Sequence, residues 1–254
     1  MSGGDQRSCV RLLVDGAAAP AWNLALDEAL LHGSVAAVRL YAWEPPGLSL
    51  GYFQRVGDFT AELAAVERRG FVVVRRPTGG GAIAHIDELT FCIADEVGGP
   101  FFTSDVKEGY RRIHHAFAAA LAALGAVTAE RGEALLASDD AAQDWLCFCK
   151  SSAVDLAAQD RKLLGSAQRR VKRRVMHHGS LPLRPNPVTP GAASVAGLLG
   201  REVSFEAMAA ALAPALAAEF SVELVADEPT QDERARAAAL VAEKYGHVSW
   251  TRRC

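Results

Sequence analysis

The chain has 254 residues, a formal net charge of −3, 50% hydrophobic residues and 22% charged residues. This composition excludes disorder as the dominant state, and the slightly negative balance argues against a dedicated nucleic-acid-binding protein. No apolar run approaches the roughly 20 residues of a membrane span, and the first residues lack the basic flank and apolar stretch of a signal peptide. We expect a cytoplasmic protein that binds neither nucleic acid nor a membrane.

Predicted helices and strands are interspersed along the chain. Helical spacing of apolar residues predicts helices over 21–32, 61–70, 106–124, 204–220 and 231–245. Alternating or β-branched runs predict strands over 34–43, 48–54, 71–76, 82–86, 89–95, 153–158, 161–170 and 177–183. The strands near 82–86 and 89–95 are expected to pair. Hairpins rather than regular βαβ units indicate an α+β fold.

Local signals add detail to these elements. Asp27 and Glu28 are expected on the wetter side of the first helix. Gln159-Asp160 is expected at the tip of a hairpin, and the proline-rich segment 184–200 is expected to form a loop. Five cysteines without framework spacing indicate free thiols, and Cys92 reads as a small buried side chain.

A run of three glycines follows two arginines after a predicted strand. Glycine adopts positive φ readily and has no Cβ to block a ligand, so the N–H groups of Gly79, Gly80 and Gly81 can converge on a phosphate or an acyl carbonyl. Arg75 and Arg76 would add positive charge there. The alternative is a tight turn without a ligand. No Gly-Lys-Ser/Thr follows, which excludes a P-loop.

Lys162 is one of five lysines in the chain, and seven of the fourteen residues 161–174 are basic. One interpretation is a solvated, arginine-rich hairpin. The other is a positive surface for an acidic carrier or a nucleotide, with Lys162 turned inward onto an acyl carbonyl or phosphate. The small residues Gly165, Ser166 and Ala167 would then allow a ligand to approach the strand closely.

The segment from Arg75 to His85 reads RRPTGGGAIAH and resembles the RRxxGGG-x-V-x-H signature of the lipoate–protein ligase and octanoyltransferase family. Further segments resemble the family in the expected order, over 22–31, 40–54, 161–170, 177–183 and 244–250. One departure is that Ile86 separates His85 from Asp87, where the family has an aspartate directly after the histidine. The sequence leaves open whether Asp87 takes that place.

The resemblance implies an α+β fold of the biotin/lipoate protein ligase catalytic-domain type, with mixed sheets flanked by helices. It implies a single catalytic domain over 1–254, without the additional C-terminal domain of longer ligases. The family's substrate-binding lysine falls on Lys162. His85 and His178 lie in family motifs and are expected to line the pocket, and Arg75 is expected to shape the acyl or phosphate site.

Cys147 points to one branch of this family. The stretch from Cys147 to Leu156 resembles the CF-xxx-S-xx-[DE]-L pattern of the octanoyltransferases whose cysteine carries the acyl group. A thiolate is a strong nucleophile and a good leaving group from an acyl link, and basic neighbours raise its population. The alternatives are an inert buried thiol or, with Cys149 and the pair His177-His178, a metal site. The spacing is not a regular zinc pattern, and we expect no metal.

Two enzymatic hypotheses follow, which share the candidate site. In the first, octanoyl-acyl carrier protein acylates Cys147, with Lys162 and backbone N–H groups holding the carbonyl oxygen, and no cofactor is needed. The acyl group then passes to the lysine of a lipoyl domain, in a glycine-cleavage H protein or in the acyltransferase subunit of a 2-oxoacid dehydrogenase. In the second, an ATP-dependent lipoate–protein ligase acts through lipoyl-AMP and uses ATP and Mg.

Individual residues favour different hypotheses. The unbroken run Gly79–Gly81 favours the ligase, because cysteine-type transferases often carry a larger third residue. Cys147 favours the transferase. A third hypothesis, a non-catalytic binder of lipoyl domains, would be marked by the loss of Lys162 or of the glycines, and neither is lost.

Overall fold

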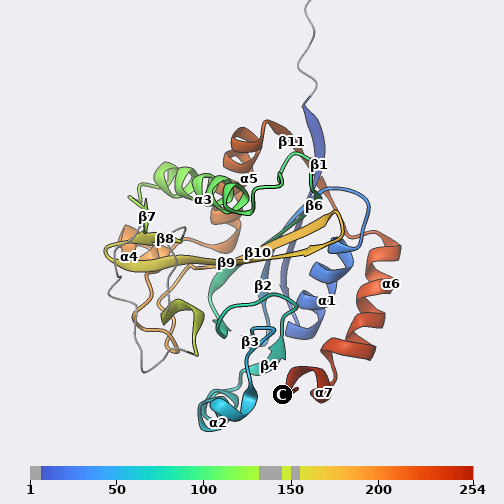
Figure 1. The fold of residues 1–254 in the computed structure, drawn as a ribbon. Coiled ribbons are helices and arrows are strands. Elements are labelled where there is room, and N and C mark those ends of the chain that lie inside the picture. The colour runs from blue at the N-terminus through green and yellow to red at the C-terminus, as the bar shows by residue number, and fades with distance from the viewer. Residues whose placement is uncertain (1–6, 132–144, 150–154, 254) are drawn as a thin grey trace, which may run out of the picture.

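The computed structural model describes residues 7–131, 145–149 and 155–253, which form two sheets surrounded by helices (Figure 1). The larger sheet contains β1 (Ser8–Ala18), β2 (Ala37–Trp43), β6 (Glu88–Glu96), β7 (Ala129–Glu130), β8 (Leu156–Ala158), β9 (Arg161–Val171), β10 (Arg174–Pro182) and β11 (Val222–Asp227), in the order β11-β1-β2-β6-β10-β9-β8-β7. The smaller sheet contains β3 (Gly47–Leu50), β4 (Val72–Arg75) and β5 (Ile83–His85), in the order β4-β3-β5.

Helices lie on both faces of the larger sheet and beside the smaller one (Figure 1). They are α1 (Pro20–Leu31), α2 (Thr60–Arg68), α3 (Val106–Ala123), α4 (Val195–Leu199), α5 (Phe205–Phe220), α6 (Gln231–Leu240) and α7 (Val248–Thr251), with the single turns η1 (Val56–Asp58), η3 (Cys147–Cys149) and η4 (Val241–Tyr245). Figure 1 shows α3 and α5 on one side of the sheet, and α1 and α6 on the other. In the part of the chain described, no helix is long and apolar enough to cross a bilayer.

Strand β2 shows why the central strands carry almost continuous apolar sequence. Its residues Val38 and Leu40 pack into the core beneath α3 and α5, whereas Tyr41 packs into the core beneath α1. Successive side chains of a strand point to opposite faces, so a strand covered on both sides buries both sets. The predicted α+β architecture, with mixed sheets flanked by helices, is present.

The strands near 82–86 and 89–95 do not pair with each other, contrary to the expectation. β5 pairs with β3 in the smaller sheet, and β6 pairs with β2 and β10 in the larger one. The turn between them contains Asp87 at φ +47, and the chain crosses there from one sheet to the other. This crossing places the smaller sheet beside the centre of the larger one.

Three strands, β1, β7 and β11, were not predicted at all. β1 pairs in parallel with both β2 and β11, so the chain from β1 through α1 to β2 forms a βαβ unit. The segment 184–200 contains the short helix α4 rather than loop alone. The hairpin tip is confirmed, because Gln159 and Asp160 join β8 to β9 with φ of +50° and +55°.

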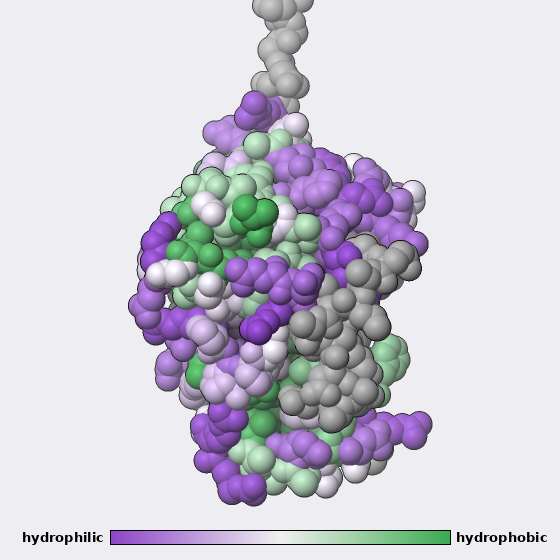
Figure 2. All heavy atoms as spheres, turned by 90° about the vertical axis from the view of Figure 1, so that its left-hand side faces the viewer, coloured by the Kyte–Doolittle hydropathy of each residue, from purple (hydrophilic) through white to green (hydrophobic). Residues whose placement is uncertain are grey.

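Figure 2 shows the molecule from the left-hand side of Figure 1, with hydrophilic and hydrophobic residues interspersed over this face. Such a mixture is usual for the surface of a folded protein.

Candidate active site

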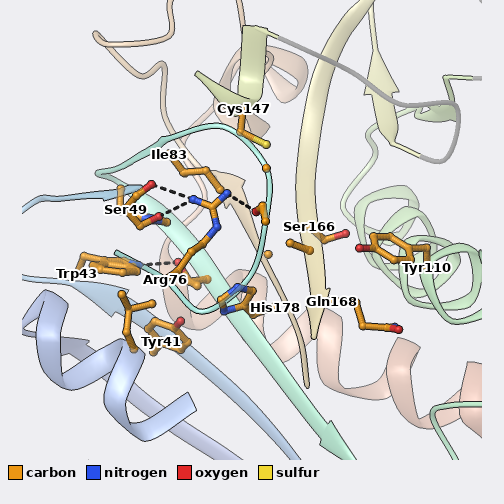
Figure 3. A pocket seen from close by; sticks show the side chains of 17 residues that line it. Tyr41, Trp43, Ser49, Arg76, Ile83, Tyr110, Cys147, Ser166, Gln168 and His178 are labelled. Atoms are coloured by element: carbon orange, nitrogen blue, oxygen red, sulfur yellow. Dashed lines mark hydrogen bonds between the residues drawn. The ribbon is translucent and has the colours of Figure 1, made fainter. Parts of the chain in front are cut away.

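A cavity of about 290 Å³ lies where the two sheets meet, next to the glycine run (Figure 3). Cys147 stands above Arg76 in this view, with Tyr41 and Trp43 below it and Tyr110 toward α3. The cavity is lined by Leu24, Tyr41, Trp43, Ser49, Arg76, Gly79, Gly80, Ile83, His85, Thr90, Tyr110, Cys147, Ser166, Ala167, Gln168, His178 and Gly179.

Cys147 is half-buried in η3 and is held by Ala82, which follows the glycine run and directly precedes β5. Its N–H donates to the Ala82 carbonyl at 2.7 Å, and the Ala82 N–H donates to the Trp145 carbonyl at 2.7 Å. Gly81 makes this approach possible, because a Cβ there would lie 2.8 Å from the backbone nitrogen of Cys147. The third glycine is therefore needed for close backbone packing that sets the position of the thiol.

Lys162 lies on β9 with its ammonium group directed at Cys147. Nζ lies 3.2 Å from the Cys147 carbonyl oxygen, 3.8 Å from Cys147 Sγ and 2.9 Å from Asp155 Oδ2. Lys162 is 3% exposed. Burial lowers its pKa, but the charges of Cys147 and Asp155 outweigh this effect, and its pKa is raised from the ordinary value. The lysine is charged and faces the thiol.

Arg76 lines the cavity beneath the glycine run. Its Nη1 donates to the Ser49 carbonyl at 2.8 Å, and its Nη2 donates to the carbonyls of Gly79 and Gly81 at 2.8 and 2.6 Å. Among the described residues, its Nε has no partner. Burial lowers the pKa of Arg76 to about 10, and the Cys147 thiol counteracts this shift. The positive charge of Arg76 thus lies against the carbonyl groups of the glycine loop. Gly80 in this loop adopts a φ of +93°.

Arg75, which the sequence predicted to shape the site, does not line the cavity. Its guanidinium donates to the carbonyls of Gly51 and Gln54 at 2.7 and 2.8 Å, and to that of Thr251 at 3.0 Å. Neighbouring residues at the end of β4 point to opposite sides, so only Arg76 faces the ligand space. Arg75 instead ties the turn after β3 to the end of the chain.

His85 lines the cavity, as predicted, and its acidic partner is Glu88. His85 Nδ1 lies 2.6 Å from Glu88 Oε1, and His85 Nε2 lies 2.7 Å from Ser49 Oγ. The ring stacks on Trp43 with 3.9 Å between centroids. Asp87, in contrast, is outside this cavity, and its carboxylate lies 3.8 Å from Arg184 at the surface. The carboxylate that contacts His85 is therefore that of Glu88 rather than that of Asp87.

His178 also lines the cavity and connects it to α1. Its Nε2 lies 2.7 Å from Thr78 Oγ1, and its Nδ1 lies 3.2 Å from Asp27 Oδ2. Asp27 accepts from Tyr41 and pairs with Arg39, each at 2.8 Å. The expectation that Asp27 faces water is wrong, because it is 0% exposed between α1 and the sheet.

A polar wall closes the cavity on the side of α3. Ser166 and Gln168 of β9 line it together with Tyr110. Burial raises the pKa of Tyr110 to about 12. Behind them His114 Nε2 lies 2.8 Å from Ser166 Oγ. His114 is 0% exposed. His115, the next residue, is exposed.

Most residues predicted from the sequence meet at this site. Cys147, Gly79, Gly80, His85, Ser166, Ala167 and His178 line the cavity. Lys162, Gly81 and Gly165 lie directly behind it, since Lys162 contacts Cys147, Gly81 supports it, and a Cβ on Gly165 would lie 3.4 Å from Lys162 Cε. Residues 150–154 of the cysteine motif lie outside the described residues.

Sequence reasoning left several cavity-lining residues out of the candidate site, among them Trp43, and did not single out Asp155, which contacts Lys162. Trp43 stood in a segment that resembles the family, and Asp155 occupies the acidic position of the cysteine motif, so each had a signal. Arg76 was named with Arg75 as a source of positive charge beside the glycine run, and the structure places it in the cavity lining. Among the described residues, no group of three or more His, Cys, Asp or Glu could hold a metal ion.

Residues 19–226 match the family model of the lipoyl protein ligase A/B catalytic domain. The chain belongs to this family. One relative is the octanoyltransferase LipM of Kyrpidia tusciae, which is 34% identical, with 96% of this chain and 98% of the relative covered. Another is the octanoyltransferase LipM of Moorella thermoacetica, which is 32% identical, with 96% of this chain and 97% of the relative covered. The family match confirms the predicted family, and these relatives bear out the prediction of an octanoyltransferase.

The family fold is confirmed by solved structures. The crystal structure of a lipoate-protein ligase A bound with ATP superposes with a TM-score of 0.78 at 23% identity, covering 95% of this chain and 98% of the other. In this lipoyl protein ligase A/B catalytic domain, the same scaffold carries a thiol, an ammonium group and a buried guanidinium at one end of a cavity. That arrangement is suited to acyl transfer through a thioester.

Proposed function

We propose that this chain is an octanoyltransferase that takes an octanoyl group from octanoyl-acyl carrier protein, holds it as a thioester on Cys147 and passes it to the lysine of a lipoyl domain. Relatives of that name support this proposal over an ATP-dependent ligase. The observation that carries it is the Cys147 sulfur 3.8 Å from the Lys162 ammonium group, at one end of the cavity. The donor is a carrier protein of the cytoplasm, where we expect the enzyme to work.

In the first half-reaction the Cys147 thiolate attacks the carbonyl carbon of the donor thioester. The carbonyl oxygen becomes an oxyanion, and Lys162 and the N–H groups of the glycine loop stabilise it. The intermediate collapses with loss of the carrier's thiolate, which takes a proton from solvent. One thioester replaces another, so this step is near neutral in free energy and needs no ATP.

In the second half-reaction a neutral lysine amine of the lipoyl domain attacks the acyl-enzyme. The Cys147 thiolate leaves, and the nitrogen loses its extra proton to solvent, which yields an amide. An amide is more stable than a thioester, so the overall transfer is downhill. The acyl chain would extend from Cys147 past Arg76 toward Tyr41 and Trp43, which line the same cavity.

The test mixes the protein with octanoyl-acyl carrier protein and an apo lipoyl domain in the absence of ATP and follows both proteins by intact mass. We expect one octanoyl group on the enzyme and then one on the acceptor. Cys147→Ala should abolish both. Cys149→Ala is the matched control in the same turn, and because Cys149 packs in a core cluster, it should retain transfer.

Modification only with free lipoate and Mg-ATP, unaffected by Cys147→Ala, would instead identify a ligase. An acceptor lysine on either a glycine-cleavage H protein or a dehydrogenase acyltransferase subunit fits the proposal, and comparing the two as substrates ranks them.

A further inference from the structure

The Lys162 ammonium group has a second anionic neighbour besides the thiol. Its Nζ lies 2.9 Å from Asp155 Oδ2. Asp155 is 4% exposed and Lys162 is 3% exposed, so the pair is shielded from water. A buried ammonium group remains charged only when nearby negative charge compensates for its lost hydration. Among the described residues, the Cys147 thiolate and the Asp155 carboxylate supply such charge in the free enzyme.

The local fold holds Asp155 opposite the lysine. Asp155 directly precedes β8, whose Ala157 pairs with Lys162 next to a bulge, and the Asp155 carbonyl accepts a hydrogen bond from the Arg131 N–H at 2.9 Å. The lysine stem lies beside Gly165, and its Nζ lies 5.7 Å from the centroid of the Phe148 ring. The carboxylate and the ammonium group are thus both anchored on paired strands.

The charges change during the proposed reaction. Once Cys147 is acylated, its sulfur is neutral and no longer compensates for the charge of Lys162. The Asp155 carboxylate keeps its charge, and it is in direct contact with Nζ. The second half-reaction nevertheless needs a charged Lys162, because attack of the amine places a new oxyanion beside it.

We infer that Asp155 is a positioning residue that keeps Lys162 protonated and aimed at the acyl carbonyl in the acyl-enzyme, so that discharge to the lipoyl lysine depends on it more than acylation does. This inference rests on the proposed function. Among the described residues, the titratable neighbours of this pair include Tyr110 on α3, which interacts with the charges of Asp155 and Cys147, and Arg76 below the glycine loop, which interacts with that of Cys147. His85 and His178 line the same cavity.

The test measures the two half-reactions separately in Asp155→Asn, which keeps the shape and removes the charge. Rapid-quench intact mass gives the rate of acylation, and the purified acyl-enzyme mixed with lipoyl domain gives the rate of discharge. We expect acylation to fall by a few-fold at most and discharge to fall by about 100-fold at pH 8. Lys162→Ala should lose both.

The pH dependence of discharge separates this role from a structural one. In wild type the rate should rise with pH as the attacking amine loses its proton. In Asp155→Asn the buried lysine loses its own proton earlier, so the rate should stop rising about one pH unit lower or more. Asp155→Glu restores the charge and should restore the wild-type profile. If Asp155→Asn does not fold, Asp155→Ser, which also removes the charge, takes its place in both measurements.

Equal losses in both half-reactions with an unchanged pH profile, or no loss in either, would overturn the inference while leaving the proposed function intact. A wild-type enzyme that never forms an octanoyl thioester would overturn both.

Discussion

At the scale of single residues, the two adjacent arginines have different surroundings. Arg76 joins the carbonyls of Ser49 and of the glycine loop, beside the thiol, whereas Arg75 joins the turn after β3 to Thr251. Both are buried, so burial alone does not distinguish them. Only the direction of each side chain at the end of β4 decides which one faces the ligand.

We expect Arg76→Lys to slow acylation of Cys147 by about 10- to 100-fold, because an ammonium group keeps the charge but cannot bridge three carbonyls. Arg75→Lys is the matched comparison. It should leave the acylation rate of the folded enzyme within a few-fold and cost about 1–3 kcal/mol of unfolding free energy. Rapid-quench mass spectrometry and urea unfolding measure the two effects. The reverse pattern would mean that the roles of the arginines are exchanged.

Gly81→Ala should displace the thiol from Lys162. The new Cβ would lie 2.8–2.9 Å from backbone atoms of Trp145, Leu146 and Cys147, which cannot be accommodated without movement of η3. We expect the rate of acylation to fall by about 100-fold or more, as when a reacting group is misplaced by an ångström. Gly57→Ala, where no atom lies within 4 Å of the new Cβ, should be silent. A fully active Gly81→Ala would contradict this account of the glycine run.

At the scale of elements, α1 shows that the elements packed around a helix decide whether its polar residues face water. The helix is covered by the larger sheet on one side and by α6 on the other (Figure 1). Asp27 and Asn23 are consequently buried, although both are polar. Asp27 is acceptable there because Arg39, Tyr41 and His178 satisfy its carboxylate.

Asp27→Ala should destabilise the fold strongly. Of the acidic partners that the described residues provide, Arg39 would keep Asp15, and a buried guanidinium would be left partly uncompensated. We expect a loss of about 3–5 kcal/mol in the free energy of unfolding, as for other broken buried pairs. Urea unfolding monitored by circular dichroism measures it. Asp58→Asn, at an exposed carboxylate of η1, is the control and should change stability by less than about 0.5 kcal/mol. Equal stabilities would rule out a structural role for the Asp27 network.

At the scale of the whole molecule, buried histidines link stability to pH. Burial lowers the pKa of His177 well below the ordinary value and also lowers that of His178. The unfolded chain therefore binds protons that the folded chain does not bind. The contribution of these histidines to the stability of the fold is fully present above about pH 6.5, the pKa of a histidine in the unfolded chain, and is lost as the pH falls below it. Among the described residues, His177 Nε2 has no hydrogen-bond partner.

We expect His177→Phe to flatten the fall in unfolding free energy between pH 7.5 and pH 5.5, because it removes one of the groups that takes up a proton on unfolding. The surrounding rings of Phe91, Phe102 and Tyr110 should accept the phenyl group. Urea unfolding at several pH values measures the slopes. His115→Phe, at an exposed histidine, should leave the slope unchanged. Parallel curves for wild type and His177→Phe would contradict this linkage.

The amino-acid sequence by itself determined the family, the helices with strong apolar spacing and the segments that form the site. The signals for the glycine run, Cys147, Lys162 and His178 are local, since each depends on a short motif whose residues stay together in any fold. The hairpin at Gln159 and Asp160 was equally local, because two turn-forming residues between apolar runs suffice to predict it.

Only the tertiary structure decided which polar groups meet. Arg76 rather than Arg75 faces the cavity, Glu88 rather than Asp87 contacts His85, and Asp155 lies against Lys162. The pairing of β1 with β11 joins residues more than 200 positions apart. The physical reason is the same in each case: the direction and burial of a side chain depend on which layers cover its strand or helix, and those layers come from distant parts of the chain.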